Sequence, residues 1–151
     1  MYNVRQSARR TKQRLTKRRI ALIQLEQSVR LLEAGDPVCA LTLAGAAEEI
    51  FGHAASRKGH VPRVEYNADW FGSFYDWVKK PRPSKKQLIT YLNSTRNHLK
   101  HQDDGRNIKV EADFEFEAEE MILRCMYNHF NAYGCYPASK RLRGWFDHMT
   151  L

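Results

Sequence analysis

Apolar residues recur at helical spacing along most of the chain. The first such segment predicts a long amphipathic helix from Thr11 to Ala34, because its apolar positions form one seam with a seven-residue period. Gly35 is expected to end this helix. The seam consists of Leu15, Leu22 and Val29, with Leu25 and Leu32 between them.

A second helix is predicted to begin directly afterwards. Asp36 is suited to cap its first turn, Pro37 fits the first helical position, and Gly59 is suited to end it in a left-handed conformation. Small residues are frequent in this segment, so neighbouring backbones are expected to come close. At 100° per residue, its apolar arc contains Leu41, Leu43, Ala47, Ile50, Phe51 and Ala54.

The third segment is rich in aromatic residues. Residues 60–69 are predicted to form a loop, and Asp69 to cap a short helix over 70–80 that ends before the prolines of the following PRP sequence. We expect the apolar face of this helix to pack in the core, with a dimer contact or a platform for stacking bases as the alternatives. That face consists of Trp70, Phe71, Phe74 and Trp77.

Two further long helices and one short helix are predicted after the prolines. Ser84 is suited to cap a helix over 85–102, which contains the stretch TRNHLKHQ at its end. Asp113 is suited to cap a helix over 114–133, where several glutamates in the first turns match the positive end of the helix dipole. A short helix over 140–149 is expected before the end of the chain.

The pattern as a whole predicts an all-α protein. The sequence contains no convincing strand pattern, internal repeat or low-complexity linker, so we expect an up-and-down bundle of four to five main helices. At 151 residues the chain has the size of a single domain. Within this domain, residues 1–20 form a basic N-terminal extension leading into the first helix, and residues 133–151 form a C-terminal tail with a short helix.

Composition narrows the class of protein. The chain is 42% hydrophobic, with no apolar run that approaches a membrane span and no apolar secretory segment, which predicts a cytoplasmic protein without membrane association. The cysteines Cys39, Cys125 and Cys135 are odd in number and widely spaced. This spacing argues against a disulfide framework or a structural zinc site, and we expect reduced thiols that lie mostly in the core.

The net charge of +8 is concentrated at the beginning of the chain. Residues 1–20 contain eight basic residues and no acidic residue, so the rest of the chain is neutral. Such a block attracts phosphate polyanions through counterion release. A solvated helix end, an acidic partner or a membrane surface are the alternatives. The predicted nucleic-acid-binding residues are Arg9, Arg10, Lys12, Arg14, Lys17, Arg18 and Arg19.

Arg96 is the most informative charged residue, because the helical wheel places it on the apolar stripe formed by Leu88, Ile89, Leu92 and Leu99. A guanidinium in that position requires a carboxylate or phosphate partner. We expect this partner to be Glu48, which lies at the edge of the second helix's apolar arc. Its neighbour Glu49 falls on the open face with Thr42 and His53.

His101 follows Arg96 by five residues. The same spacing recurs at Arg124 and His129, and at Arg143 and His148, so spacing alone does not identify a site. The wheel places His129 in the core and turns Arg124 elsewhere. Five residues of regular helix rotate a side chain by about 140°, so Arg96 and His101 point to one spot only if the helix unwinds or if two subunits form a composite site.

The motif Arg96-Asn97-x-x-x-His101 at the end of a helix, preceded by the helix sequence LAGAAEEI, resembles the HEPN superfamily, over roughly residues 11–132. The resemblance implies a four- or five-helix bundle that dimerises. Many members are metal-independent ribonucleases in toxin–antitoxin, anti-phage or RNA-processing roles, and others have no activity. It therefore implies RNA as substrate, a homodimer, no cofactor or metal, and a possible neutralising antitoxin protein.

The resemblance also implies roles for individual residues. Imidazole titrates near neutral pH, so His101 is the expected acid–base group for RNA cleavage. Arg96 would stabilise the phosphorane, and Asn97 would orient the phosphate or the histidine. His98 and Lys100 are expected to be auxiliary cations, with Glu48 in a supporting role. Alternatively, Lys100 and His101 merely stabilise the negative end of a helix dipole.

Other chemistries lack the motifs that they require. The sequence contains no Glu-x-x-His pair for a di-iron bundle, no H-E-x-x-H motif, no Gly-rich phosphate loop and no serine hydrolase elbow. The hypothesis is therefore a HEPN-type endoribonuclease. The alternative is a non-catalytic HEPN-like module that binds nucleic acid or assembles with another protein.

Overall fold

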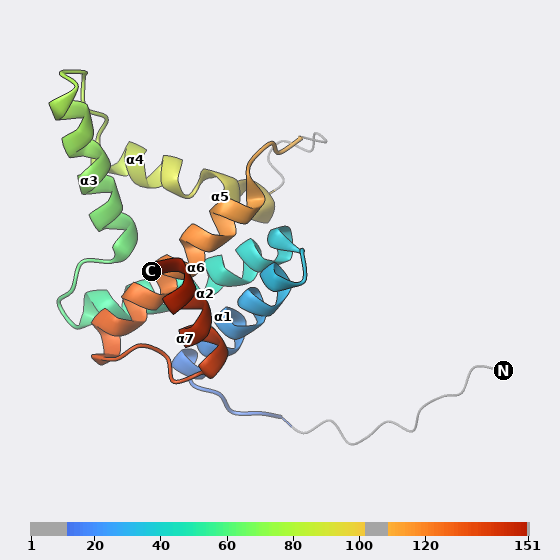
Figure 1. Ribbon diagram of the computed structural model, residues 1–151. Coiled ribbons are helices and arrows are strands. Elements are labelled where there is room, and N and C mark those ends of the chain that lie inside the picture. Colours follow the sequence, from blue (N-terminus) through green and yellow to red (C-terminus); the bar gives the residue numbers. More distant parts are fainter. Residues whose placement is uncertain (1–11, 102–108, 151) are drawn as a thin grey trace.

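The structure is a computed structural model that describes residues 12–101 and 109–150. Over these residues it is all-helical, without strands, which confirms the predicted all-α fold class (Figure 1). None of the helices in the described part is long and apolar enough to cross a membrane. In chain order they are α1 (Lys17–Glu33), α2 (Pro37–Arg57), α3 (Arg63–Trp77), α4 (Lys85–Leu92), α5 (Ser94–Lys100), α6 (Phe114–Tyr133) and α7 (Lys140–Thr150).

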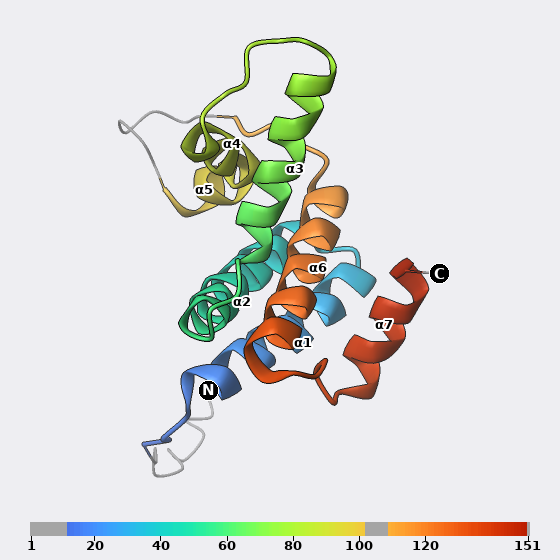
Figure 2. The same ribbon diagram turned by 90° about the vertical axis from the view of Figure 1, so that its left-hand side faces the viewer.

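The core lies between α1, α2 and α6, and α7 packs against α1 (Figures 1 and 2). Small residues allow close approach of α2 and α6, as predicted: the Cys125 thiol of α6 donates a hydrogen bond to the backbone carbonyl of Ala44 at 3.2 Å. The largest apolar side chains of this core are Leu25, Val29, Leu41, Phe51, Met121, Ile122, Met126 and Leu142.

The predicted N-caps at Asp36, Ser84 and Asp113 are confirmed. The Asp36 carboxylate accepts from the Cys39 backbone N–H at 3.1 Å, and Asp113 accepts from Phe116 at 3.0 Å. Ser84 and Gln87 form a reciprocal capping box. Each cap satisfies backbone donors that have no partner within the helix.

Two predicted helix starts are wrong. The first helix begins at Lys17 rather than Thr11, because Thr16 accepts from the Arg19 N–H at 3.1 Å and so caps it; residues 12–16 precede the helix. The third helix begins at Arg63, within the predicted loop, after Pro62. Asp69 is therefore not a cap. It lies inside α3 and its carboxylate pairs with Lys85 at 3.0 Å.

The predicted fourth helix is divided at Asn93 into α4 and α5. Arg124 of α6 donates to the Leu92 carbonyl at 3.3 Å and to the Asn93 side-chain oxygen at 2.8 Å. Asparagine readily leaves helical conformation in favour of such side-chain bonds. The second part, α5, ends at Lys100, and the expected end near residues 103–105 lies outside the described residues.

The aromatic face of α3 is exposed, so the expectation that it packs in the core is wrong. Its exposed fractions range from 37% at Phe71 to 78% at Trp77. Both views show why: α3 and α4 pack against each other beyond the α1–α2–α6 core (Figures 1 and 2). Only Ala68, Gly72 and Leu88 of these two helices are buried.

The cysteine prediction is half correct. All three cysteines are free thiols, as expected. Only Cys125 is buried, whereas Cys39 and Cys135 are exposed, so the expectation that they lie mostly in the core is wrong. Burial raises the pKa of the Cys125 thiol well above its ordinary value, which keeps it protonated.

His129 is a core histidine, as predicted. It is fully buried, its Nδ1 lies 2.7 Å from the Cys135 carbonyl oxygen, and its ring packs edge-on against Phe51 at 5.2 Å between centroids. A carbonyl only accepts, so Nδ1 carries the proton and the buried Nε2 has no partner in the described part of the chain. Burial therefore lowers the pKa of His129 below its ordinary 6.5.

This burial makes stability depend on pH. Well above pH 6.5, His129 is neutral in both the folded and unfolded states. As the pH falls through 6.5, the unfolded state takes up a proton more readily than the folded state, so stability falls. Urea unfolding at pH 7.5 and 5.0 is expected to show a smaller loss of stability for His129→Gln than for the natural chain. An equal loss in both proteins would contradict this assignment.

Candidate functional site around Arg96

Arg96 is buried where α5 crosses α2. The methylene groups of its side chain lie across Gly45: a Cβ atom at that position would come within 2.4 Å of the Arg96 Cδ. Gly45 is therefore required because the Arg96 side chain lies against its backbone, and not because a neighbouring backbone comes close. The glycine in the LAGAAEEI sequence thus admits the arginine of the motif.

The predicted pairing of Arg96 with Glu48 is present. Arg96 Nη1 lies 3.6 Å from Glu48 Oε2 and 3.2 Å from Glu49 Oε1, while Nη2 donates to the Asn97 side-chain oxygen at 3.3 Å. Glu49 is a second partner that the helical wheel assigned to the open face. Its side chain is indeed 45% exposed, but it also reaches Lys100 at 3.0 Å.

Glu48 binds a second arginine, Arg124, so the prediction that Arg124 faces away from the core is wrong. Arg124 Nη2 lies 3.2 Å from Glu48 Oε1, and the Asn128 side-chain amide donates to the same oxygen at 3.3 Å. Arg124 and Asn128 are four residues apart on the inner side of α6 and both are buried. This i, i+4 spacing beside Met121 and Cys125 was the available signal. We call Glu48, Glu49, Arg96, Asn97, Lys100 and Arg124 the Arg96 cluster.

The Arg96 cluster has a positive formal charge. Burial raises the pKa of Glu49, but the hydrogen bond from Lys100 and the charges of Arg96, Lys100 and His53 outweigh this effect and lower it overall. Glu49 is therefore a carboxylate at neutral pH. Two arginines and one lysine face two carboxylates, so one positive charge remains to attract an anion.

His101 lies just beyond the helix that carries Arg96. Its backbone is extended (φ −120°, ψ 128°), although its N–H still donates to the Asn97 carbonyl at 3.1 Å. Unwinding at His101 is one of the two arrangements that would redirect its side chain. Among the described residues, no hydrogen bond or ion pair joins the His101 imidazole to Arg96. His98 and His101 are both exposed.

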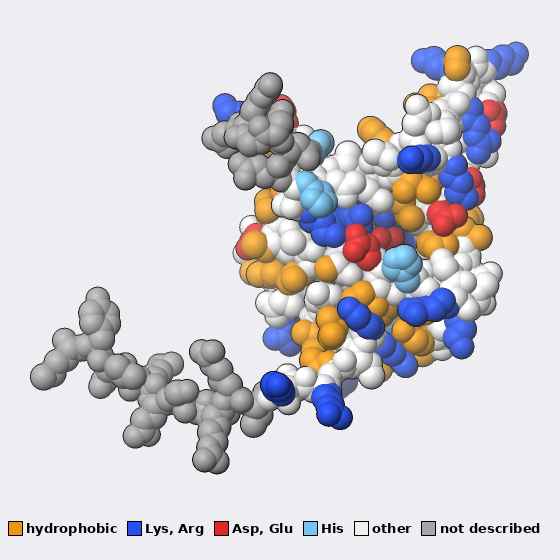
Figure 3. All heavy atoms as spheres, turned by 180° about the vertical axis from the view of Figure 1, so that it is seen from behind, with side chains coloured by type: hydrophobic (Ala, Val, Ile, Leu, Met, Phe, Trp, Pro, Cys, Tyr) orange, Lys and Arg blue, Asp and Glu red, His pale blue; other side chains and the backbone are white. Residues whose placement is uncertain are grey.

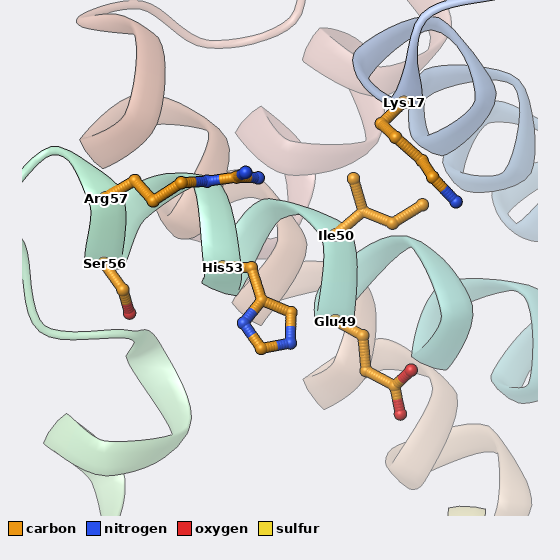
Figure 4. Close-up of a pocket in the computed structure, with 6 residues that line it drawn as sticks. All are labelled: Lys17, Glu49, Ile50, His53, Ser56 and Arg57. Atoms are coloured by element: carbon orange, nitrogen blue, oxygen red, sulfur yellow. The ribbon is translucent and has the colours of Figure 1, made fainter.

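Two hollows flank the exposed face of α2. Arg96 and His53 line one of about 380 Å³, together with Glu48 and Asn93. Lys17, Ile50 and Arg57 line the other, of about 590 Å³ (Figure 4). Glu49, His53 and Ser56 belong to both hollows. His53 was not predicted as a site residue, because its position on an open helix face gives no signal without α5 beside it.

The basic segment remains exposed at the start of the described chain. Lys12 and Arg14 precede α1, and Lys17, Arg18 and Arg19 form its first turn. Cations at a helix N-terminus oppose the helix dipole at a cost of about 0.3–1 kcal/mol each. The Arg18 guanidinium lies over the Tyr133 ring, 4.1 Å from its centroid. Arg9 and Arg10 lie outside the described residues.

The chain matches no protein-family model, no curated protein and no solved structure. Function must therefore be inferred from the geometry of the site and from the motif. In the described part of the chain, no group of three or more His, Cys, Asp or Glu side chains is arranged to hold a metal ion.

The two glutamates of the cluster are expected to differ in their contribution to stability. Glu48→Ala leaves Arg96 and Arg124 buried without their shared carboxylate, so the free energy of unfolding should fall by about 3–5 kcal/mol. Glu49→Ala removes a half-exposed carboxylate and should lower it by less than about 1 kcal/mol. Urea unfolding followed by circular dichroism measures both, and equal effects would contradict the described network.

Proposed function

We propose that this protein is a metal-independent endoribonuclease of HEPN type that acts as a homodimer, in a toxin, defence or RNA-processing role. The observation that supports it is the inward position of Arg96, fixed by Glu48 and bonded to Asn97, one turn before an exposed histidine. Arg96, Asn97 and His101 are the three residues of the motif. A guanidinium held in place before RNA binds needs little reorganisation to stabilise a phosphorane.

In the proposed reaction, the 2′-hydroxyl loses a proton to a base and attacks the adjacent phosphorus. The bond from phosphorus to the 5′-oxygen breaks, and that oxygen takes up a proton. The products are a 2′,3′-cyclic phosphate and a 5′-hydroxyl. His101 carries these protons, with the second copy of the histidine available across a two-fold axis. Arg96 and Asn97 bind the phosphate oxygens as charge develops on them.

Glu49 has a specific place in this proposal. Arg96 now contacts two carboxylates, of which Glu48 is buried and Glu49 is half exposed. A phosphate therefore reaches the guanidinium when Glu49 releases it, while Glu48 keeps holding the arginine from behind. Lys100, the other partner of Glu49, is suited to retain the displaced carboxylate.

The exposed aromatic surface of α3 and α4 supports the homodimer. Six residues are exposed by 37–78%, which at roughly 150–250 Å² per aromatic side chain amounts to on the order of 700 Å². A standard protein interface buries about 800 Å² on each partner. The two helices bury little within one subunit, so a second copy would supply the missing contacts. The surface consists of Tyr66, Trp70, Phe71, Phe74, Trp77 and Tyr91.

A second candidate function is favoured by the contacts of Arg96 itself. Its Nη1 faces two carboxylates, and its Nε is buried without a partner among the described residues. Such an arginine also suits a purely structural role. The protein would then be a non-catalytic HEPN-like module that binds nucleic acid through its basic segment or assembles with another protein. In the ribonuclease version, the resemblance also implies a neutralising antitoxin protein as a partner.

Cleavage of single-stranded RNA in EDTA tests the nuclease directly. The natural chain is expected to leave 2′,3′-cyclic phosphate ends, and His101→Ala should lower the rate by roughly 10²–10⁴-fold, because the acid–base group is lost. His148→Ala, which removes an exposed histidine of α7, is the matched control and should leave the rate unchanged. Cleavage that survives His101→Ala would favour the binding module.

The homodimer has its own test in solution. The natural chain is expected to sediment with twice its chain mass of 17.7 kDa, and Trp70→Ser with Trp77→Ser should shift it to the monomer, because both indoles lie in the aromatic surface. Phe130→Ser, at an exposed phenylalanine near the C-terminal end of α6, is the control and should remain dimeric. A natural chain that sediments as a monomer would remove this part of the proposal.

A further inference from the structure

The two hollows beside α2 adjoin each other, because Glu49, His53 and Ser56 line both, and together they make a groove that crosses the exposed face of this helix. Figure 4 shows Glu49, His53 and Ser56 extending to one side of α2, and Ile50 and Arg57 to the other. One end of this groove is lined by Arg96 and the other by Lys17 of α1. We call it the α2 groove.

The Lys17 end of the α2 groove holds two cations without carboxylate partners. Figure 4 shows the Lys17 and Arg57 side chains extending from different helices on either side of Ile50. Within the described part of the chain, neither forms an ion pair. Glu49 is the single acidic residue lining that hollow among those described, and it already binds Arg96 and Lys100. The lining therefore has an excess of positive charge, which favours an anion.

The length and lining of the α2 groove indicate the class of anion. From Glu49 to Arg57 the helix advances about 12 Å, which exceeds the size of one phosphate group. Ile50, whose side chain suits a sugar, lies between Lys17 and Arg57 (Figure 4). The His53 imidazole and Ser56 hydroxyl, which can donate hydrogen bonds, also line the hollow on the Arg96 side. In a chain of phosphodiesters, charged phosphates alternate with sugars, so it matches cations on either side of an apolar side chain better than a single anion does.

Basic side chains near the beginning of α1 extend the positive surface beyond the Lys17 end of the α2 groove. Figure 3 shows Lys and Arg side chains gathered near the beginning of the described chain, with histidine and acidic side chains above them on the same face. Lys12, Arg14 and Arg19 are exposed next to Lys17. A polyanion in the groove would therefore meet the basic segment at one end and the Arg96 cluster at the other.

We propose that the α2 groove binds the backbone of single-stranded RNA, with Lys17 and Arg57 each contacting a phosphate, and that it leads the strand to Arg96. This inference rests on the proposed function for its end point, but the binding site itself stands on the geometry of α1 and α2. Neither Lys17 nor Arg57 takes part in the proposed proton transfers. They fix the path and register of the strand.

The test measures binding to a labelled single-stranded RNA by fluorescence anisotropy, in EDTA and in the His101→Ala background so that the RNA stays intact. Adding Lys17→Gln and Arg57→Gln is expected to weaken binding roughly 10- to 30-fold at 0.1 M salt, and to reduce the slope of log K against log salt by about 1.4, because each lost phosphate contact removes about 0.7. Circular dichroism verifies that the variants remain folded.

The matched control removes two charges from α7 by Lys140→Gln and Arg143→Gln, both at exposed positions. It should bind RNA with nearly the natural affinity and slope. Equal weakening in the two double variants would overturn the inference, since net charge alone would then explain binding. Unchanged binding by the Lys17 and Arg57 variant would overturn it as well, and would leave the hollow to an acidic protein partner.

Binding and cleavage together separate this inference from the proposed function. If the natural chain does not cut RNA, but the Lys17 and Arg57 substitutions weaken binding as stated, the groove stands and the nuclease does not. If the natural chain cuts RNA and the same substitutions leave KM unchanged, the nuclease stands and the groove does not. Inorganic phosphate should compete only weakly with the RNA, because it fills one of the two phosphate positions.

Discussion

The buried carboxylate of Glu48 is the interaction on which the rest of the site depends. Removing a carboxylate and two guanidinium groups from water costs several kcal/mol per ion, and only close pairing with additional hydrogen bonds offsets that cost. Glu48 meets this requirement because Arg96, Arg124 and Asn128 approach its two oxygens from α5 and α6. One side chain of α2 thereby fixes the positions of two other helices.

The same network explains the shape of the segment that carries the motif. Arg124 binds Glu48 on one side and the Leu92 carbonyl and Asn93 on the other, so the pairing that holds Arg96 also divides α4 from α5. Arg96 then faces inward, while His98, Lys100 and His101 lie near solvent at the helix end. A buried arginine beneath an exposed helix end is suited to binding an anion that arrives from solution.

Two other regions of the surface differ in chemical character. One carries the cations of the first turn of α1 and of the α2 groove, where no ion pair in the described chain neutralises Lys17 and Arg57. The other carries the aromatic surface of α3 and α4, which the core does not cover. Polyanions are attracted by the first and apolar protein surfaces by the second, so the two surfaces need not compete for one partner.

The sequence by itself determined the helical fold class, the caps at Asp36, Ser84 and Asp113, and the inward turn of Arg96 toward Glu48, because each follows from side chains within a few residues or from one helical period. Only the tertiary structure decided the break at Asn93, the choice of Glu48 as the partner of Arg124, the early start of α3 and the exposure of its aromatic face. The start of α3 depends on a bond from the Arg63 N–H to Asn128, 65 residues away, and the break on Arg124, 31 residues from Asn93. Partners so distant along the chain leave no local pattern.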